Sequence, residues 1–103
     1  MRKTTDALKI LDRMTGPNKR LRRRIEEATL NARVAEMIYE ARTKAGLSQQ
    51  SLADLVGTKQ PVIARLEDAT YEGHSLSMLA RIAAALHSEL DVRFVPPKRK
   101  TAA

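Results

Sequence analysis

Apolar side chains recur at helical spacing over most of the chain. A long stripe begins near Leu30 and follows one helix face until Gly46 ends it. Shorter apolar stripes cover residues 49–56, 58–68 and 76–87, each bounded by a polar or glycine residue. This pattern predicts an all-α domain of four to five helices, spanning residues 19–88.

A separate short amphipathic helix is predicted over residues 5–14, and a Gly-Pro pair follows it. Its apolar positions are Ala7, Leu8, Leu11 and Met14. We expect residues 1–18 to form an N-terminal amphipathic extension. This helix either packs on its own domain or frays in solution, or it docks against another protein, because a detached apolar stripe needs a surface that covers it.

Residues 89–95 alternate polar and apolar side chains, which predicts a short β-strand ended by two prolines. A lone strand cannot satisfy its backbone hydrogen bonds inside a helical domain. We therefore expect it to pair with a second copy or with a partner's sheet edge, and the alternative is a pendant extension. Residues 96–103 are expected to form a disordered basic tail.

The residue types in and around the stripes at 49–56 and 58–68 fit the steric requirements of a helix-turn-helix. Ser48 can cap the first short helix, and Gly57 follows it where the turn favours positive φ. Ala53 is small where the two helices must cross closely. A turn of about three residues then leads into the second helix at Thr58 or Lys59.

Two stretches resemble the Xre/Cro-type helix-turn-helix family of phage repressors and bacterial regulators: Gly46-Leu47-Ser48-Gln49-Gln50-Ser51-Leu52-Ala53 and Gly57-Thr58-Lys59-Gln60-Pro61-Val62-Ile63-Ala64-Arg65-Leu66-Glu67. The resemblance covers about Leu30 to Leu86 and implies a lambda-repressor-like DNA-binding fold. The narrower likeness is to HigA-type antitoxins of type II toxin–antitoxin systems, on residues 60–67 and on the predicted terminal strand.

A helix fits the major groove of B-DNA and presents its first turn to the base edges. The residues expected to contact DNA are Gln49, Thr58, Lys59, Gln60, Pro61, Ala64 and Arg65. Gln60 can address adenine through two hydrogen bonds, whereas Lys59 and Arg65 can reach guanine or a phosphate. The resemblance supports Gln60 and Arg65 as readers and Gln49 as a phosphate clamp, while Pro61 departs from the phage pattern.

Two charged residues are assigned a structural role instead. Arg42 and Glu67 align with a partly buried ion pair of the phage repressors, and charges at such positions are more often paired than functional. Arg33, Lys44 and Arg81 have no such assignment, so solvated surface is the expectation for each.

The net charge of +7 and the pI near 10.3 favour a polyanionic partner, although the charge is unevenly distributed. Residues 1–24 carry +7, residues 25–95 carry −3 and the remaining tail carries +3. The basic cluster at residues 19–24 is either a solvated helix start or an arm that contacts phosphates. Aromatic residues make up only 3%, which counts against stacking on RNA.

Composition and spacing argue against an enzyme. The chain has no Cys, its two His lie far apart, and no clustered carboxylates complete a metal or nucleophilic site. We expect no cofactor and no metal. No apolar run approaches the roughly 20 residues that span a bilayer, so we expect a bacterial protein of the cytoplasm without membrane contact.

Three functions are consistent with these features. The first is a homodimeric antitoxin that represses its own operon on double-stranded operator DNA; the resemblance makes its toxin a small ribosome-dependent mRNA interferase, docked by Leu8, Leu11 and Met14. Such toxins are generally basic, so apolar contacts must carry this docking. The second is a stand-alone Xre-type regulator without a toxin. The third is a structural or RNA-binding adaptor that uses the basic flanks without sequence preference.

Overall fold

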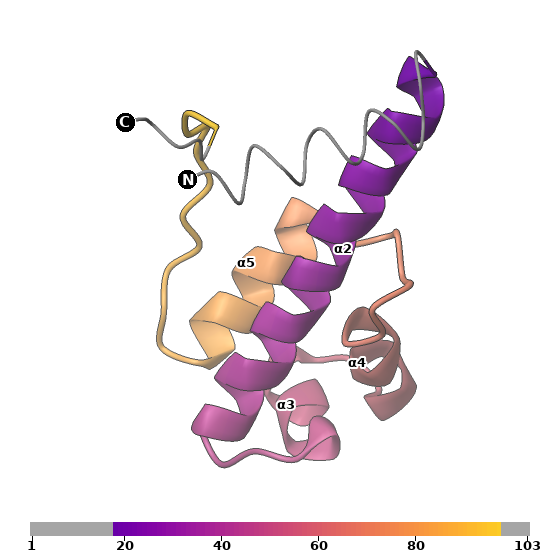
Figure 1. The fold of residues 1–103 in the computed structure, drawn as a ribbon. Helices are drawn as coiled ribbons and strands as arrows, with labels where there is room; N and C mark the ends of the chain where they lie inside the picture. Colours follow the sequence, from indigo (N-terminus) through magenta and orange to yellow (C-terminus); the bar gives the residue numbers. More distant parts are fainter. Residues whose placement is uncertain (1–17, 98–103) are drawn as a thin grey trace. The chain divides into compact units, whose positions relative to one another are not determined.

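The computed structural model describes residues 18–97, and this part of the chain contains four helices (Figure 1). They are α2 (Lys19–Lys44), α3 (Gln49–Val56), α4 (Gln60–Leu66) and α5 (Leu76–Ala85). The all-α fold predicted from the apolar pattern is thereby confirmed. The helix predicted over residues 5–14 lies outside the described residues.

The ends of α2 follow from two local features. At its start, Asn18 Oδ1 accepts the backbone N–H of Leu21 at 2.9 Å, so an asparagine caps the first turn. At its end, Gly46 adopts a φ of 76°, a left-handed conformation that glycine reaches without steric cost. The predicted termination of the long helix at this glycine is confirmed.

The described residues divide into two units. One extends from Glu27 to Asp91, and the other takes residues 18–26 and 92–97. All of α3, α4 and α5 belong to the first unit, together with most of α2. The two helices predicted to form the helix-turn-helix are therefore part of a single compact body.

α3 lies at the centre of this body because it packs against both α4 and α5. Leu52 and Ala53 on α3 are fully buried, and they join Ile63 of α4, Ile82 of α5 and Ile38 of α2 in one apolar cluster. Burial of each large aliphatic side chain contributes about 1.5–3 kcal/mol. The crossing of α3 and α4 is thus fixed by the core of the domain.

The apolar stripe predicted along α2 is only partly buried. Of the predicted positions, Ile38 is buried and Val34 is half-buried, whereas Leu30 is 58% exposed and Ala41 is also exposed. The buried residues of α2 begin at Ala35 and end at Arg42. Both ends of the predicted stripe consequently face solvent.

The strand predicted over residues 89–95 is not formed. This segment has no regular secondary structure, and none of the residues in the described range 18–97 forms a strand. A strand needs a neighbour whose backbone completes its hydrogen bonds, and the single chain provides none in that range. The alternating pattern instead marks an irregular segment whose Val92, Phe94 and Val95 are exposed.

Candidate nucleic-acid interface

A tight turn of three residues, 57–59, joins α3 to α4. Gly57 adopts a φ of 87°, and its N–H donates to the Ala53 carbonyl at 2.9 Å, while the N–H of Thr58 donates to the same oxygen at 2.8 Å. At the other end of α3, Ser48 Oγ accepts the N–H of Ser51 at 3.0 Å. These are the caps that the residue types predict, and the helix-turn-helix is confirmed.

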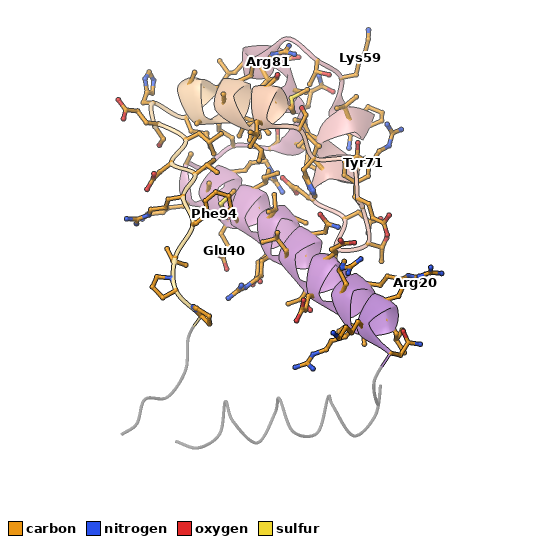
Figure 2. All side chains as sticks on the ribbon, turned by 90° about the horizontal axis from the view of Figure 1, so that it is seen from above. Arg20, Glu40, Lys59, Tyr71, Arg81 and Phe94 are labelled. Atoms are coloured by element: carbon orange, nitrogen blue, oxygen red, sulfur yellow. The ribbon has the colours of Figure 1, made fainter. Side chains whose placement is uncertain are left out.

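α4 buries one face and exposes the other. Ile63 and Leu66 enter the core, whereas Lys59, Pro61 and Arg65 are exposed. Pro61 lies in the first turn, where a missing N–H removes no intrahelical hydrogen bond. The exposed side of α4 therefore presents Lys59 and the ring of Pro61 at its start (Figure 2) and Arg65 in its last turn.

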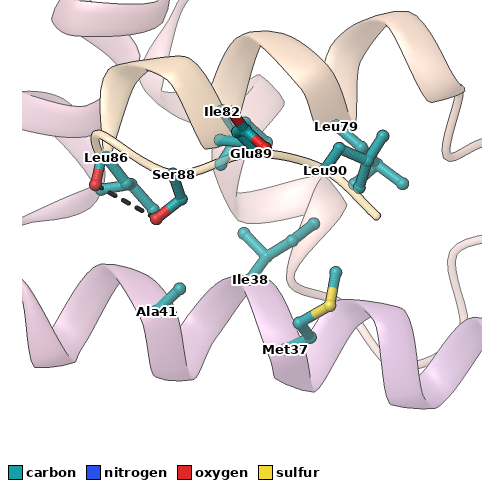
Figure 3. A pocket seen from close by; sticks show the side chains of 10 residues that line it. Met37, Ile38, Ala41, Leu79, Ile82, Leu86, Ser88, Glu89 and Leu90 are labelled. Atoms are coloured by element: carbon teal, nitrogen blue, oxygen red, sulfur yellow. Dashed lines mark hydrogen bonds between the residues drawn. The ribbon is translucent and has the colours of Figure 1, made fainter. Parts of the chain in front are cut away.

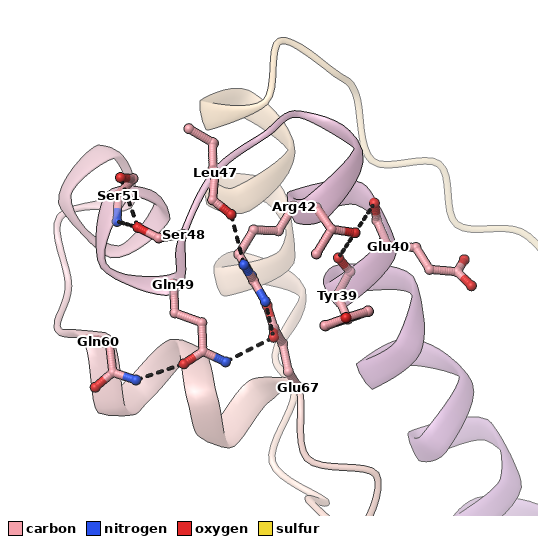
Figure 4. Close-up of polar contacts among 10 residues, drawn as sticks. Tyr39, Glu40, Arg42, Leu47, Ser48, Gln49, Ser51, Gln60 and Glu67 are labelled. Carbon is pink, nitrogen blue, oxygen red and sulfur yellow. Dashed lines mark hydrogen bonds and ion pairs between the residues drawn. The ribbon is translucent and has the colours of Figure 1, made fainter.

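A chain of hydrogen bonds connects the start of α4 to α3 and then to the end of α4 (Figure 4). Glu67 Oε1 accepts from Gln49 Nε2 at 3.0 Å, and Gln49 Oε1 accepts from Gln60 Nε2 at 2.7 Å. Since a carboxylate only accepts, Gln49 must turn its NH₂ group toward Glu67 and its carbonyl toward Gln60. Gln60 then directs one N–H at Gln49, and its Oε1 and second N–H point to no partner within this chain of bonds.

Glu67 also anchors Arg42 of α2 (Figure 4). Arg42 Nε donates to Oε2 at 2.6 Å and Nη2 donates to Oε1 at 3.0 Å, and the side chains of the two residues are only 10% and 5% exposed. Arg42 Nη1 donates to the Leu47 carbonyl at 2.7 Å. The hydrogen bond to Glu67 raises the pKa of Arg42 against the opposing effect of burial. The structural ion pair expected for these residues is confirmed.

The seven residues predicted to contact DNA lie at the first position of α3, in the turn and on α4. Three are exposed, namely Lys59, Pro61 and Arg65, and four are partly buried, namely Gln49, Thr58, Gln60 and Ala64. The structure gives Gln49 an additional role, because its side chain holds Gln60 in place; its phosphate clamp stays a prediction. Leu8, Leu11 and Met14 lie outside the described residues.

Two side chains that sequence reasoning left without a role bind the ends of these helices. Arg81 Nη2 donates to the Val56 carbonyl at 2.9 Å, and His74 Nε2 donates to the Leu66 carbonyl at 2.7 Å. α3 has no basic residue in its own last turn, so Arg81 of α5 supplies the cation that its carboxyl end favours. The absence of a basic residue from the last turn of α3 was the sequence signal for such a contact. Spacing alone could not identify Arg81, because it lies 25 residues from Val56 in the sequence.

The described residues show neither a metal cluster nor a membrane span. Within residues 18–97, no three His, Cys, Asp or Glu side chains gather closely enough to hold an ion. No helix in the same range combines the length and the apolar character that a membrane crossing requires.

Comparison with known protein families matches residues 38–92, more than half of the chain, to the helix-turn-helix family model. The protein therefore belongs to the helix-turn-helix family, in its Xre/Cro-type branch, and is a DNA-binding transcriptional regulator. Comparisons with curated proteins and with solved structures give no match. The matched range contains α3, α4, α5 and the ion pair between Arg42 and Glu67.

Proposed function

We propose that α4 reads an operator sequence in the major groove, with Gln60 as its central reader. The observation that carries this proposal is the hydrogen-bond chain from Glu67 through Gln49 to Gln60. A base-reading side chain that already holds one orientation before DNA binds avoids the free-energy cost of becoming ordered on binding. The hydrogen bond from Gln60 to Gln49 holds Gln60 in this way.

The hydrogen-bonding groups of Gln60 that Gln49 does not engage match adenine. Its Oε1 can accept from adenine N6, and its second N–H can donate to adenine N7, which is the two-bond contact that glutamine makes in the major groove. Lys59 and Arg65 flank it on the exposed face of α4 and can contact guanine or a phosphate. Pro61 can add an apolar contact with a thymine methyl.

Direct contacts must supply much of the affinity of this surface. Residues 49–68 carry two basic side chains against three acidic ones, so counterion release from this unit alone is small. Binding to the operator should therefore exceed binding to unrelated duplexes. We propose further that the protein binds as a homodimer, whose two α4 helices reach half-sites about 34 Å apart.

The finer proposal is a HigA-type antitoxin that neutralises a small toxin and represses its own operon. It is supported by the likeness of residues 60–67 to the recognition helix of that subfamily. Leu8, Leu11 and Met14 would dock the toxin, which would be an mRNA interferase. The alternative is a stand-alone Xre-type regulator, which shares the reading of DNA and lacks the partner.

Selection of binding sites from random duplex DNA tests the reading of DNA. The proposal expects one enriched motif, palindromic with half-sites one helical turn apart and with an adenine at the Gln60 position. Enrichment without any common motif would contradict it.

Purification from a strain that expresses the gene together with its neighbouring reading frames tests the antitoxin proposal. We expect a small basic protein at a fixed stoichiometry. Recovery of the chain alone would exclude the antitoxin and leave the stand-alone regulator.

A further inference from the structure

An apolar pocket opens on the Glu27–Asp91 unit, between α2, α5 and the segment that follows α5 (Figure 3). Its volume is about 150 Å³. The side chains that line it are mainly aliphatic, and the principal ones are Met37, Ile38, Ala41, Leu79, Leu86 and Leu90. An apolar cavity of about this volume is large enough to take a benzene-sized ring.

The same chain carries an aromatic side chain with no cover. Phe94 is 106% exposed, and its neighbours Val92 and Val95 are 64% and 68% exposed. Soluble proteins rarely leave such a group of apolar side chains in water unless it binds a partner. The chain therefore carries both an open apolar pocket and an exposed aromatic ring.

We propose that two copies of this chain exchange these features, each inserting Phe94 into the pocket of the other. Entry into the chain's own pocket is disfavoured, because Leu90 is already part of the pocket wall. No glycine, proline or asparagine lies between Leu90 and Phe94, and the β-branched Val92 favours extended backbone. Extended backbone carries Phe94 about 13 Å beyond Leu90.

Symmetry also favours a second copy as the occupant. A two-fold interface uses each contact twice, so one exchange covers both rings and fills both pockets. The inference rests on the proposed homodimer and assigns its interface.

Phe94 is the only phenylalanine in the chain, which allows a direct test. Replacing it with 4-fluorophenylalanine gives one ¹⁹F resonance, to be followed in the full-length protein over a concentration series, with the mass measured in parallel by sedimentation. We expect the solvent isotope shift of this resonance to fall as the dimer forms. We also expect Ala41→Leu, which fills the pocket from an exposed position, to abolish the change.

Phe94→Ser and Ala41→Leu should each raise the dissociation constant of the dimer by about 100-fold or more, because each removes two central contacts. Leu55→Ser is the matched control, since Leu55 is 59% exposed and does not line the pocket. It should leave the dimer intact.

Each other outcome overturns the inference in a distinguishable way. A dimer in which the fluorinated ring stays exposed to solvent would refute the exchange and retain the homodimer. A ring that is buried in the monomer would mean insertion into its own pocket. A monomer at all concentrations would refute both the exchange and the proposed homodimer.

Discussion

Glu67 connects the stability of the domain to the orientation of Gln60, the side chain proposed to read DNA. One carboxylate accepts two hydrogen bonds from Arg42 and a third from Gln49. Through Arg42 it ties α2 to the end of α4, and through Gln49 it fixes Gln60. Glu67, which lies outside the proposed DNA-reading surface, thus links the packing of α2 and α4 to the orientation of Gln60.

Substitution of this carboxylate should be costly. Glu67→Ala leaves the buried Arg42 without its counter-charge, and we expect a loss of about 3–5 kcal/mol in the free energy of unfolding, measured by urea denaturation. Glu72→Ala, in the exposed loop before α5, is the control and should stay within about 0.5 kcal/mol of the wild type. A Glu67→Ala protein as stable as this control would contradict the anchoring role.

Asp68 makes a contribution to stability that depends on pH. The backbone N–H of Thr70 and then its hydroxyl donate to Asp68 Oδ1, both at 2.8 Å, and lower the pKa of that carboxyl. A lowered pKa in the folded state stabilises the protein above the unfolded pKa, near 3.9, and this contribution is lost as pH falls through the folded pKa. Asp68→Asn should therefore cost stability at pH 7, and its difference from the wild type should shrink toward pH 3. A difference that is constant with pH would refute this.

Local residue types predicted the turn because its requirements are local. Ser48 caps α3, Gly57 takes the left-handed conformation after it, and Ala53 is small where the helices cross; each requirement arises within a few residues of the turn. The bond between Gln49 and Gln60 could not be predicted in the same way, since it depends on the angle at which α3 crosses α4. Arg81 was missed for the same reason, because its acceptor at Val56 lies on another helix.

The connection between α3 and α4 depends on Gly57, whose backbone is left-handed. At Gly57 an added Cβ would meet only Arg81 Nη2, at 3.7 Å, so a substitution there is opposed by the backbone conformation and not by crowding. Gly57→Ala should destabilise the domain by about 1–2 kcal/mol, measured by thermal or urea unfolding.

Asparagine provides the matched comparison at the same site, because it adopts left-handed backbone more readily than alanine. Gly57→Asn should recover part of the loss. Equal stability of the alanine and glycine proteins would contradict the role of positive φ at this turn.

The segment after α5 shows where periodicity misleads. Residues 89–95 alternate as a strand does, but a strand also needs a partner, and the pattern in one chain cannot say whether a partner exists. α2 shows a related limit: its apolar stripe continues to Leu30, although its burial begins only at Ala35. Helical spacing identifies a helix, whereas the extent of its contacts depends on the other elements.

At the scale of the whole molecule, most of the positive charge lies outside the part that reads DNA. Residues 1–24 carry +7, whereas residues 25–95 carry −3. The proposed division of labour places specific reading in the folded body and partner binding in the N-terminal extension.

Removal of residues 1–17 tests this division while keeping Asn18, which caps α2. We expect the affinity for the operator to change by no more than about two-fold, because no base contact is lost. We expect any toxin binding to disappear. Anisotropy titrations at two salt concentrations provide the measurement. A large loss of operator affinity together with a shallower salt dependence would instead identify the extension as a phosphate-binding arm.

Gln60, fixed by Gln49 and Glu67, is proposed to read one base pair. The direct measurement is the affinity of wild type, Gln60→Ala and Gln50→Ala for the selected operator and for each of its single-base-pair variants. Gln50 is an exposed amide on α3 that donates to Asp54 at 2.9 Å, and it serves as the control. We predict that replacing one adenine pair costs wild type and Gln50→Ala about 1–3 kcal/mol of binding free energy, and that Gln60→Ala loses discrimination at this position alone. Unchanged discrimination by Gln60→Ala at every position of the operator would contradict it.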